Sequence, residues 1–276
     1  MNITLWGTRG SLPTPGPETI HFGGNTPCIS VSSGNNLLIL DAGSGIRRLG
    51  AQLKKYGRID ILLTHFHMDH IQGLGFFNPL YNPEAEIHIW GAAGATQNLR
   101  TRLKRYLSPP LFPVRIRDLP CQLHLHEMTQ QSVEIGDFFV TANYVCHPSP
   151  TLGFRVQQGE TVLTYISDHE LALGRRGFTG DPQWTSGFSL AEGADLLIHD
   201  AQYSPEEYDA RRGWGHSSIV HALQFARLAR VKHLLLFHHD PAHTDQDLRE
   251  MHEKYTSKES WPFVVEVAAE GSSYIL

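Results

Sequence analysis

The sequence predicts an α/β protein in which strands and helices alternate, and three observations support this fold class. Short apolar runs such as Ile59–Leu63 have the length and composition of buried strands. Segments with helical spacing, such as residues 46–56, stand between these runs. Several strands end directly at a histidine or an aspartate, as in α/β enzymes that build a site at one rim of a sheet.

The size and composition of the chain are those of an ordinary soluble protein. Its 276 residues, of which 41% are apolar and 18% charged, allow a buried core, and we expect one domain over residues 1–276. No apolar run approaches the ~20 residues that span a bilayer, so we expect no membrane partner. The N-terminal stretch lacks the basic and apolar regions of a signal peptide, and the three cysteines form no CxxC pair. We therefore expect a cytoplasmic protein.

The first half of the chain is predicted to hold several strands, one long loop and one helix. The stretch 9–28 is rich in Gly and Pro, which interrupt regular structure and predict a loop. Helical spacing runs from Ile46 to Tyr56, and Gly57 ends it. Strands are predicted at Ile3–Thr8, Cys28–Ser32, Leu37–Leu40, Ile59–Leu63 and Ile87–Trp90.

The second half is predicted to add strands and two helices. One helix begins after Ser217 or Ser218 as its cap, and another begins near Thr244, with Asp247 completing a capping box. Strands are predicted at Phe138–Cys146, Leu152–Gln157, Thr161–Ile166, Asp195–Ile198, His233–Phe237, Phe263–Ala268 and Ser273–Leu276.

Residues 95–120 interrupt this alternation with a short basic helix and a Pro-rich turn. The basic side chains are open to two interpretations, a phosphate-binding face or, more commonly, a solvated helix face. They are Arg100, Arg102, Lys104 and Arg105. The nearby rings of Tyr106 and Phe112 would suit a lid or a wall of a substrate site.

The densest group of candidate functional residues is THFHMDHIQG, residues 64–73, directly after a buried strand. Alternate residues of an extended segment point the same way, so His65 and His67 can hold one ion. Asp69 and His70 lie further along the turn, where they can reach a second ion. Imidazole nitrogens and carboxylate oxygens suit zinc and similar divalent metals. One such pair would carry little weight, but this density of ligand types predicts a metal site.

Later strands also end at histidine or aspartate side chains. These strand ends are His147, Asp168, Asp200 and His238. An aspartate alone is often only a turn former. Because strand ends of an α/β sheet meet at one rim, the recurrence of these residues predicts a metal centre built from distant parts of the chain.

The motif THFHMDHIQG, followed in order by His147, Asp168 and His238, resembles the metallo-β-lactamase superfamily of binuclear metal hydrolases. The resemblance covers nearly the whole chain. It implies an αββα four-layer sandwich, in which two mixed central sheets lie between outer helices, with a binuclear site along one edge. It also implies two divalent metal ions. Zn²⁺ is the first expectation and Mn²⁺ the alternative, since histidine and carboxylate ligands accept both.

Carried over residue by residue, the resemblance assigns a complete ligand set. The set is His65, His67 and His147 for the first metal, Asp69, His70 and His238 for the second, and Asp168 as the bridge. His239 is the alternative to His238, which we prefer because it directly follows its predicted strand.

Within the superfamily, the chain most resembles the branch that contains tRNase Z and small-molecule phosphodiesterases. The stretches ADLLIHDAQY and WGHSS carry this resemblance. In that branch a later histidine acts as general acid and a carboxylate orients it, roles that fall here to His216 and Asp200. A carboxylate that accepts from one imidazole nitrogen fixes the tautomer of the ring. The other interpretation of His216 is a neighbour of a helix cap without a catalytic role.

One departure from this branch bears on the substrate. Bacterial-type tRNase Z enzymes carry a long tRNA-binding arm, whereas here the short interval between His147 and Asp168 is filled by a predicted hairpin. The net charge is −5, which argues against a broad nucleic-acid surface. We therefore expect a small phosphodiester, such as a cyclic nucleotide, as substrate and no long nucleic acid as partner. The resemblance leaves a homodimer open.

The expected reaction is phosphodiester hydrolysis by a binuclear metal-dependent enzyme. Two bound metals would lower the pKa of water and neutralise charge on the phosphate. Asp69 would hold the nucleophile and accept its proton. His216 would donate a proton to the leaving alkoxide, and general-acid help of this kind contributes about 10²–10⁴-fold.

Other functions stay open at this point. A thioester or lactam hydrolase of the same fold would share every metal ligand and would not need Asp200 and His216. A nuclease acting on short RNA or DNA is another alternative. A non-catalytic nucleotide-binding protein would bind without turnover. A flavodiiron redox role is disfavoured, because His67 stands where that group has a glutamate.

Overall fold

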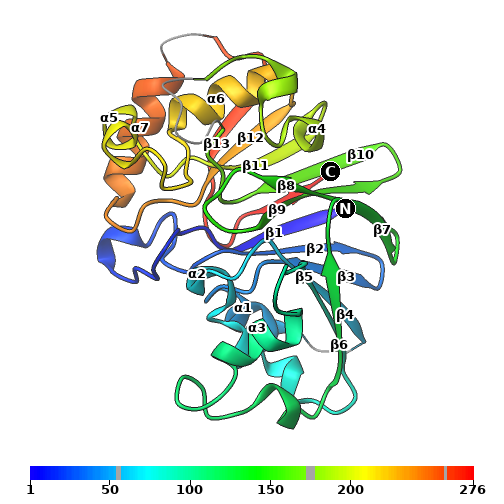
Figure 1. The fold of residues 1–276 in the computed structure, drawn as a ribbon. Coiled ribbons are helices and arrows are strands. Elements are labelled where there is room, and N and C mark those ends of the chain that lie inside the picture. The colour runs from blue at the N-terminus through cyan, green and yellow to red at the C-terminus, as the bar shows by residue number, and fades with distance from the viewer. Residues whose placement is uncertain (54–56, 172–177, 258–259) are drawn as a thin grey trace.

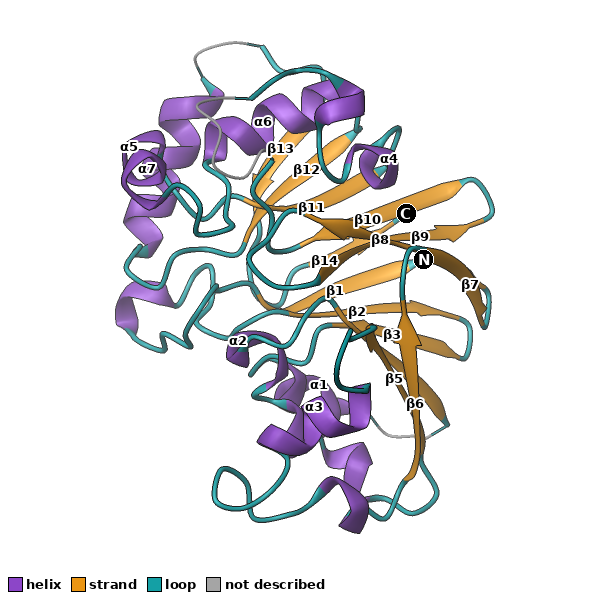
Figure 2. Cartoon of the chain, in the orientation of Figure 1, coloured by secondary structure: helices purple, strands orange, loops and turns teal. Residues whose placement is uncertain are grey.

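Two β-sheets stack face to face, with helices on both outer faces, in the computed structural model (Figures 1 and 2). The structure describes residues 1–53, 57–171, 178–257 and 260–276. The layer order is α, β, β, α, and both sheets mix parallel and antiparallel strands. The predicted fold class, the αββα sandwich, is therefore confirmed.

The first sheet has the strand order β14-β1-β2-β3-β4-β5-β6. Strands from β14 to β3 pair antiparallel, and those from β3 to β6 pair parallel. The strands are β1 (Asn2–Gly7), β2 (Cys28–Ser33), β3 (Asn36–Leu40), β4 (Arg58–Leu63), β5 (Glu86–Ala92), β6 (Gln122–Met128) and β14 (Ser273–Ile275).

The second sheet follows the same plan, in the order β13-β12-β11-β10-β9-β8-β7. Strands from β7 to β10 pair antiparallel, and those from β10 to β13 pair parallel. The strands are β7 (Gln131–Ile135), β8 (Phe138–Val145), β9 (Thr151–Gln158), β10 (Thr161–Ile166), β11 (Leu196–Asp200), β12 (His233–Phe237) and β13 (Val264–Val267).

The helices divide between the two outer faces (Figure 2). Those on the side of the first sheet are α1 (Ile46–Gln52), α2 (Met68–Ile71) and α3 (Leu99–Tyr106). Those on the side of the second sheet are α4 (Phe188–Ala191), α5 (Pro205–Arg211), α6 (Ile219–Leu228) and α7 (Asp245–Thr256). Short 3₁₀ turns lie at Pro17–Thr19, Leu74–Phe76, Asn78–Tyr81, Ile116–Asp118 and Pro182–Trp184. None of the described helices is long and apolar enough to cross a membrane.

Three apolar cores hold these layers together. The central core fills the space between the sheets and includes Leu38 from the first and Phe154 from the second, both fully buried. A second core joins the first sheet to α1 and α3, and a third joins the other sheet to α4, α6 and α7. Burying one large apolar side chain contributes about 1.5–3 kcal/mol. Each sheet packs on the central core with one face and on an outer core with the other, and each helical layer packs on one outer core. This framework fixes the strand ends from which the site is built.

Most predicted elements are confirmed, with differences at their ends. The helix predicted over 46–56 ends at Gln52, and residues 54–56 lie outside the described residues. The capping box of α7 is present, because Thr244 Oγ1 accepts from the N–H of Asp247 (3.2 Å) and the Asp247 carboxylate accepts from the N–H of Thr244 (2.8 Å). Strands β6 and β7 and helices α2, α4 and α5 were not predicted. The two strands alternate apolar residues with polar ones and carry no apolar run, and the three helices are short.

The segment 95–120 packs as part of the outer core. Tyr106 and Phe112 are both buried among apolar side chains beneath the first sheet, so they are packing residues and do not form a lid. The Arg102 guanidinium lies 4.4 Å from the centroid of the Phe66 ring and donates to Glu127 (3.2 Å). One of the basic side chains is therefore tied to the protein itself.

Candidate metal centre

The histidine motif begins where β4 ends, and its side chains reach the rim from an extended stretch and a short helix. His65 lies on the extended stretch and is buried, and His67 immediately precedes α2 with an exposed side chain. Asp69 and His70 lie within α2 and are buried. Because an extended segment and a helix point consecutive residues in different directions, one short motif supplies groups to two neighbouring points.

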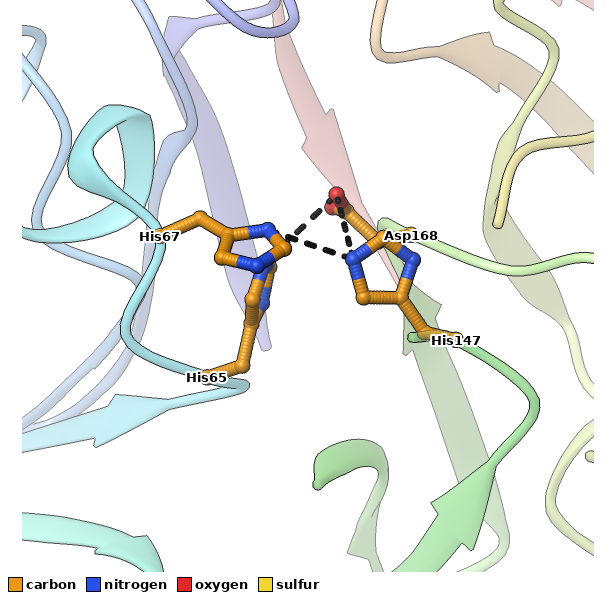
Figure 3. A group of neighbouring side chains, drawn as sticks. All are labelled: His65, His67, His147 and Asp168. Carbon is orange, nitrogen blue, oxygen red and sulfur yellow. Dashed lines mark hydrogen bonds and ion pairs between the residues drawn. The ribbon is translucent and has the colours of Figure 1, made fainter. Parts of the chain in front are cut away.

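Four side chains meet at the first point (Figure 3). His65 and His67 come from the motif, His147 follows β8, and Asp168 follows β10. His147 Nε2 lies 3.2 Å from His67 Nδ1 and 3.9 Å from Asp168 Oδ2. His65 Nε2 lies 3.7 Å from the same carboxylate oxygen. One ligand atom from each residue lies within 4.8 Å of the others, a spacing suited to a single ion.

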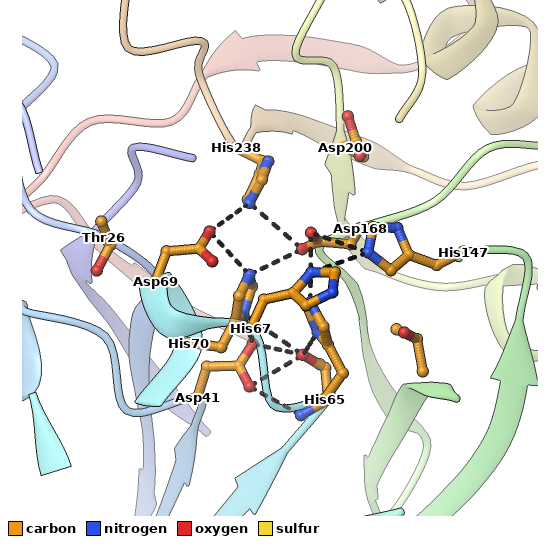
Figure 4. A network of polar contacts seen from close by, with 12 residues as sticks. Thr26, Asp41, His65, His67, Asp69, His70, His147, Asp168, Asp200 and His238 are labelled. Carbon is orange, nitrogen blue, oxygen red and sulfur yellow. Dashed lines mark hydrogen bonds and ion pairs between the residues drawn. The ribbon is translucent and has the colours of Figure 1, made fainter. Parts of the chain in front are cut away.

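Asp69, His70 and His238 meet at the second point, beside the first (Figure 4). Asp69 Oδ2 lies 3.2 Å from His70 Nε2 and 3.2 Å from His238 Nε2. Asp168 Oδ1 lies 3.0 Å from His70 Nε2 and 3.3 Å from His238 Nε2. Asp168 therefore presents one carboxylate oxygen to each point. The structure brings the whole predicted ligand set together, and the role of these residues as ligands stays a prediction.

Buried polar atoms without partners indicate what the cluster can hold. Among the described residues, His65 Nε2, His70 Nε2 and Asp168 Oδ1 are buried and have no hydrogen-bond partner outside the ion-pair contacts within the cluster itself. Leaving such groups unpaired costs about 1–3 kcal/mol each, and more when they are charged. Two divalent cations would satisfy all three atoms, and imidazole with carboxylate is a donor set that zinc and manganese both accept. The residues present therefore fit a pair of divalent metals.

The charges in the cluster also favour a cation at its centre. Burial alone would raise the pKa of Asp168, but His238, His70 and His65 hold this pKa well below its usual range. Burial alone would lower the pKa of His70, but the nearby carboxylates, first among them Asp168, raise this pKa well above its ordinary value. Carboxylates that stay ionised inside a buried site need positive charge beside them, which bound metals would supply.

Hydrogen bonds on the far side of the imidazoles orient three of the ligand histidines. The Nδ1–H groups donate to acceptors outside the cluster: His70 to Asp41 (2.8 Å), His147 to the carbonyl of Gly215 (2.9 Å) and His238 to Gln202 (3.0 Å). With metals bound, the ring proton would stay on Nδ1 and each Nε2 would present its lone pair to the cluster. Partners of this kind fix the ring orientation and raise the basicity of the ligand nitrogen.

Asp41 is the most connected of these acceptors, and the sequence analysis did not identify it as a site residue. Its carboxylate accepts from the N–H of Thr64 (2.8 Å), the Thr64 hydroxyl (3.0 Å), the Tyr165 hydroxyl (2.8 Å) and His70. Asp41 directly follows β3, so the pattern of strand-end aspartates was the signal that could have found it. Gln202 and Gly215 carried no comparable signal.

The choice between His238 and His239 follows from their orientations. His238 directs Nε2 at the cluster, whereas His239 Nε2 donates to the carbonyl of Ala268 (2.8 Å). Burial, with the Arg9 charge nearby, lowers the pKa of His239 to about 3 and keeps it neutral. His239 is therefore a buried structural residue, and the alternative ligand assignment is set aside.

His216 and Asp200 form a pair at the edge of the cluster. Asp200 ends β11, and His216 lies in the loop before α6. His216 Nδ1 donates to Asp200 Oδ2 (2.8 Å) and lies 3.9 Å from Asp168 Oδ2. Burial alone would lower the pKa of His216, but Asp200 raises this pKa to about 9. The imidazole is therefore protonated at neutral pH.

A buried glutamate that the sequence analysis did not predict holds the loop that carries His216. The Glu170 carboxylate accepts from the N–H groups of Gly213 (3.0 Å) and Gly215 (3.0 Å). Gly215 has a φ of 92°, which favours glycine, and a Cβ there would lie 2.4 Å from His147 Nδ1. The loop conformation thus positions both the His216–Asp200 pair and His147, one of the predicted ligands.

Comparisons with known proteins agree with this architecture. Residues 36–239 match the family model described as the β-lactamase superfamily domain. Ribonuclease Z of Thermococcus gammatolerans is 28% identical over 281 residues, covering 86% of this chain and 83% of the relative. Ribonuclease Z of Thermoplasma acidophilum is 26% identical over 313 residues and covers 97% of both chains. The crystal structure of human short-form tRNase Z superposes with a TM-score of 0.70 at 23% identity, covering 100% of this chain and 99% of that chain, which shows the fold.

The names of these relatives overturn one expectation. Both sequence relatives are named ribonuclease Z, so the expectation of a small substrate and of no long nucleic acid as partner is wrong. The physical error was to judge nucleic-acid binding from the net charge of the whole chain. Association depends on the local field, and metal cations are the largest local charges at a site such as this. With more than half of its length matched by the family model and both sheets, the helices and the ligand cluster in place, the chain belongs to the metallo-β-lactamase superfamily of hydrolases.

Proposed function

We propose that this chain is a two-metal phosphodiesterase that hydrolyses RNA, with residues 1–276 acting as one hydrolase domain. The observation that carries phosphodiester cleavage is the His216–Asp200 pair at the edge of the ligand cluster. A thiolate leaving group has a low pKa and departs without help, so a thioesterase gains little from a general acid there. The alkoxide released from a phosphodiester has a high pKa and needs a proton.

The proposed roles divide the reaction between the two sides of the scissile bond. Two metal ions bound by the cluster would activate water at neutral pH and neutralise charge on the phosphate. We assign Asp69, whose Oδ2 also accepts from the N–H of Ser11 (2.8 Å), to hold the attacking water and accept its proton. His216 delivers the proton to the leaving oxygen from Nε2, because its Nδ1 is engaged with Asp200.

Two features support RNA as the substrate class. The relatives that cover most of this chain are named ribonuclease Z. Two large apolar side chains next to proposed site residues are also well exposed: Met68 at 50% and Trp214 at 62%. Stacking of a base on an aromatic ring contributes about 1–3 kcal/mol, so Trp214 would suit an unpaired nucleotide beside the cleaved bond. The β9–β10 hairpin fills the interval between His147 and Asp168, where bacterial-type tRNase Z enzymes carry their tRNA-binding arm. Without such an arm in this interval, the residues around the candidate metal centre would contact the RNA.

A substrate panel tests the proposal directly. Protein loaded with Zn²⁺ or Mn²⁺ is assayed on a precursor tRNA, single-stranded RNA, cyclic nucleotides and a lactoylglutathione-type thioester. We expect the highest kcat/KM on one of the RNAs. Turnover of the thioester with no cleavage of any RNA would overturn the proposal, and turnover of cyclic nucleotides alone would overturn its substrate class.

A leaving-group comparison tests the general acid. His216→Ala should lower the rate of RNA cleavage by about 10²–10⁴-fold. The same variant should lose far less on bis-p-nitrophenyl phosphate, whose leaving group departs without a proton. Metal content should match that of the wild type, and His221→Ala, in α6, serves as the matched histidine control. An unchanged rate on RNA would refute the acid role.

A further inference from the structure

A second group of histidines lies away from the candidate metal centre, on the edge of the first sheet. Glu86 and His88 are on β5, and His124 and His126 are on the edge strand β6. The register pairs His88 with His124 directly across the two strands. Glu86, His88 and His124 lie on the N-terminal parts of their strands, whereas the predicted ligand motif follows the C-terminal end of β4, the other neighbour of β5 (Figure 1).

The pleat of the sheet puts all four side chains on one face. Ile87 and the other odd-numbered neighbours pack into the outer core, so the even-numbered residues face the opposite side. Further along β5 that side is covered by the second sheet, because Trp90 belongs to the central core. His88 is buried at 7% exposure, whereas His124 is exposed. The group therefore lies at the margin of the interface between the two sheets, with His88 buried and His124 in contact with solvent.

The contacts within this group are short and involve few other partners. His88 Nε2 lies 2.7 Å from Glu86 Oε1, and His88 Nδ1 lies 2.8 Å from His126 Nε2. The rings of His88 and His124 stack with centroids 4.5 Å apart. Among the described residues, neither nitrogen of His124 has a hydrogen-bond partner. One ligand atom each from Glu86, His88 and His124 lies within 4.8 Å of the others.

The tautomer of His88 separates two explanations of these contacts. If His126 donates to His88, the His88 Nε2–H donates to Glu86, and the group is a hydrogen-bonded relay. If a neutral His88 instead donates from Nδ1 to His126, its Nε2 lone pair faces a carboxylate oxygen, and this contact is favourable only with positive charge between the two atoms, from a bound metal or from a proton on Nε2. The second arrangement is the one in which an outer partner orients a ligand histidine, as at the candidate metal centre.

The surroundings also leave the carboxylate available. The Glu86 side chain is 43% exposed, so its carboxylate can be approached from solvent. Arg58, whose charge reaches Glu86, keeps its guanidinium engaged in a bidentate pair with Asp60 (2.8 and 3.0 Å).

We propose that Glu86, His88 and His124 form a further divalent-metal site on the edge of the first sheet, with His126 orienting His88. Two imidazoles and one carboxylate are a donor set for zinc, which binds such atoms at about 2.0–2.2 Å and would take water as a fourth ligand. The site is separate from the candidate metal centre and does not depend on the proposed function.

Metal counting tests the proposal without any assay of turnover. Metal-free protein is equilibrated with excess Zn²⁺, passed through a desalting column at a fixed free zinc concentration, and its bound zinc is measured by mass spectrometry. The variants are Glu86→Gln/His124→Ala and, as the matched exposed histidine, His21→Ala. We expect the double variant to bind one zinc ion fewer per chain than the wild type, and His21→Ala to bind the full number.

Two further readouts keep the result interpretable. Thermal unfolding of the metal-free proteins shows whether the double variant is folded, and His124→Ala alone, at an exposed position, provides a milder change. His126→Ala should lower the affinity for the same zinc ion by about 10–100-fold, because a partner that orients a ligand histidine is lost. Equal zinc content in the wild type and the folded double variant would overturn the proposal and leave a hydrogen-bonded relay.

Discussion

Replacing Asp41 with Asn tests whether this carboxylate sets the tautomer of a ligand histidine. The substitution keeps the shape of the side chain, and the φ of 59° at this position is one that Asn adopts readily. The amide oxygen must occupy the Oδ1 position, because the N–H of Thr64 points there and cannot become an acceptor. The amide N–H₂ then faces His70 Nδ1 and the Tyr165 hydroxyl.

This arrangement forces a choice on His70. Tyr165 can rotate its hydroxyl to accept, but His70 Nδ1 can accept only if the ring proton moves to Nε2. A protonated Nε2 has no lone pair for a metal, so binding must first reverse the tautomer. Loss of such an orienting partner lowers metal affinity by about 10–100-fold, or about 1.4–2.7 kcal/mol. The unfolding free energy should fall by about 1–3 kcal/mol as well, because a buried charged acceptor is lost.

Metal affinity is measured by competition with a chromophoric chelator, and unfolding by urea titration of the metal-free protein. The matched control is Asp245→Asn, a buried aspartate that accepts from the backbone N–H groups of His21 (2.7 Å) and Phe22 (3.1 Å). Its loss of stability should resemble that of Asp41→Asn, while its metal affinity stays at the wild-type value. Equal metal affinities in the two variants would refute the tautomer argument.

Three other perturbations follow from the same geometry. Glu170→Gln should lower the rate of RNA cleavage by about 10–100-fold with metal content unchanged, because an amide N–H₂ would face the backbone donors of the acid-bearing loop; a wild-type rate would contradict this. Gly10→Ala should reduce the bound metal, since its Cβ would lie 2.4 Å from His238 Nδ1, and metal counting checks the loss. Asp200→Asn should move the alkaline limb of the pH–rate profile to lower pH. Asp200 raises the pKa of His216 to about 9, and the acid form is lost as the pH rises through that value, so a limb that stays in place would exclude His216 as the acid.

The metal centre could be predicted from the sequence because its residues follow strands. A histidine such as His147 or an aspartate such as Asp168 comes directly after a run that must be buried, so its place at a sheet rim follows from the run itself. The same rule applied to β3 would have predicted Asp41. It was overlooked because the adjoining stretch, Gly43–Gly45, reads first as a turn.

Glu170 and the edge strand β6 show what the sequence could not reveal. Glu170 acts on backbone N–H groups of a loop 43 residues away, and no periodic pattern encodes such a contact. In β6, Leu123 and Leu125 face the outer core, and His124 and His126 face the other side of the sheet. This alternation is the period of two of a half-buried strand, but it extends over residues 123–126 only, which is too short a run to stand out in the sequence.

The two sheets contribute unequally to the candidate metal centre, although both follow the same plan of antiparallel and parallel strands. One short motif after β4 supplies His65, His67, Asp69 and His70, while the second sheet supplies three single residues from separate strand ends. The central core already joins the sheets through side chains such as Leu38 and Phe154, so the packing of the layers does not depend on the candidate metal centre. Bound metals would act at the rim, where buried nitrogen and oxygen atoms of the cluster have no partner outside it. Binding and catalysis can therefore change through the loops that carry Asp41, Glu170 or His216 while the sandwich itself stays the same.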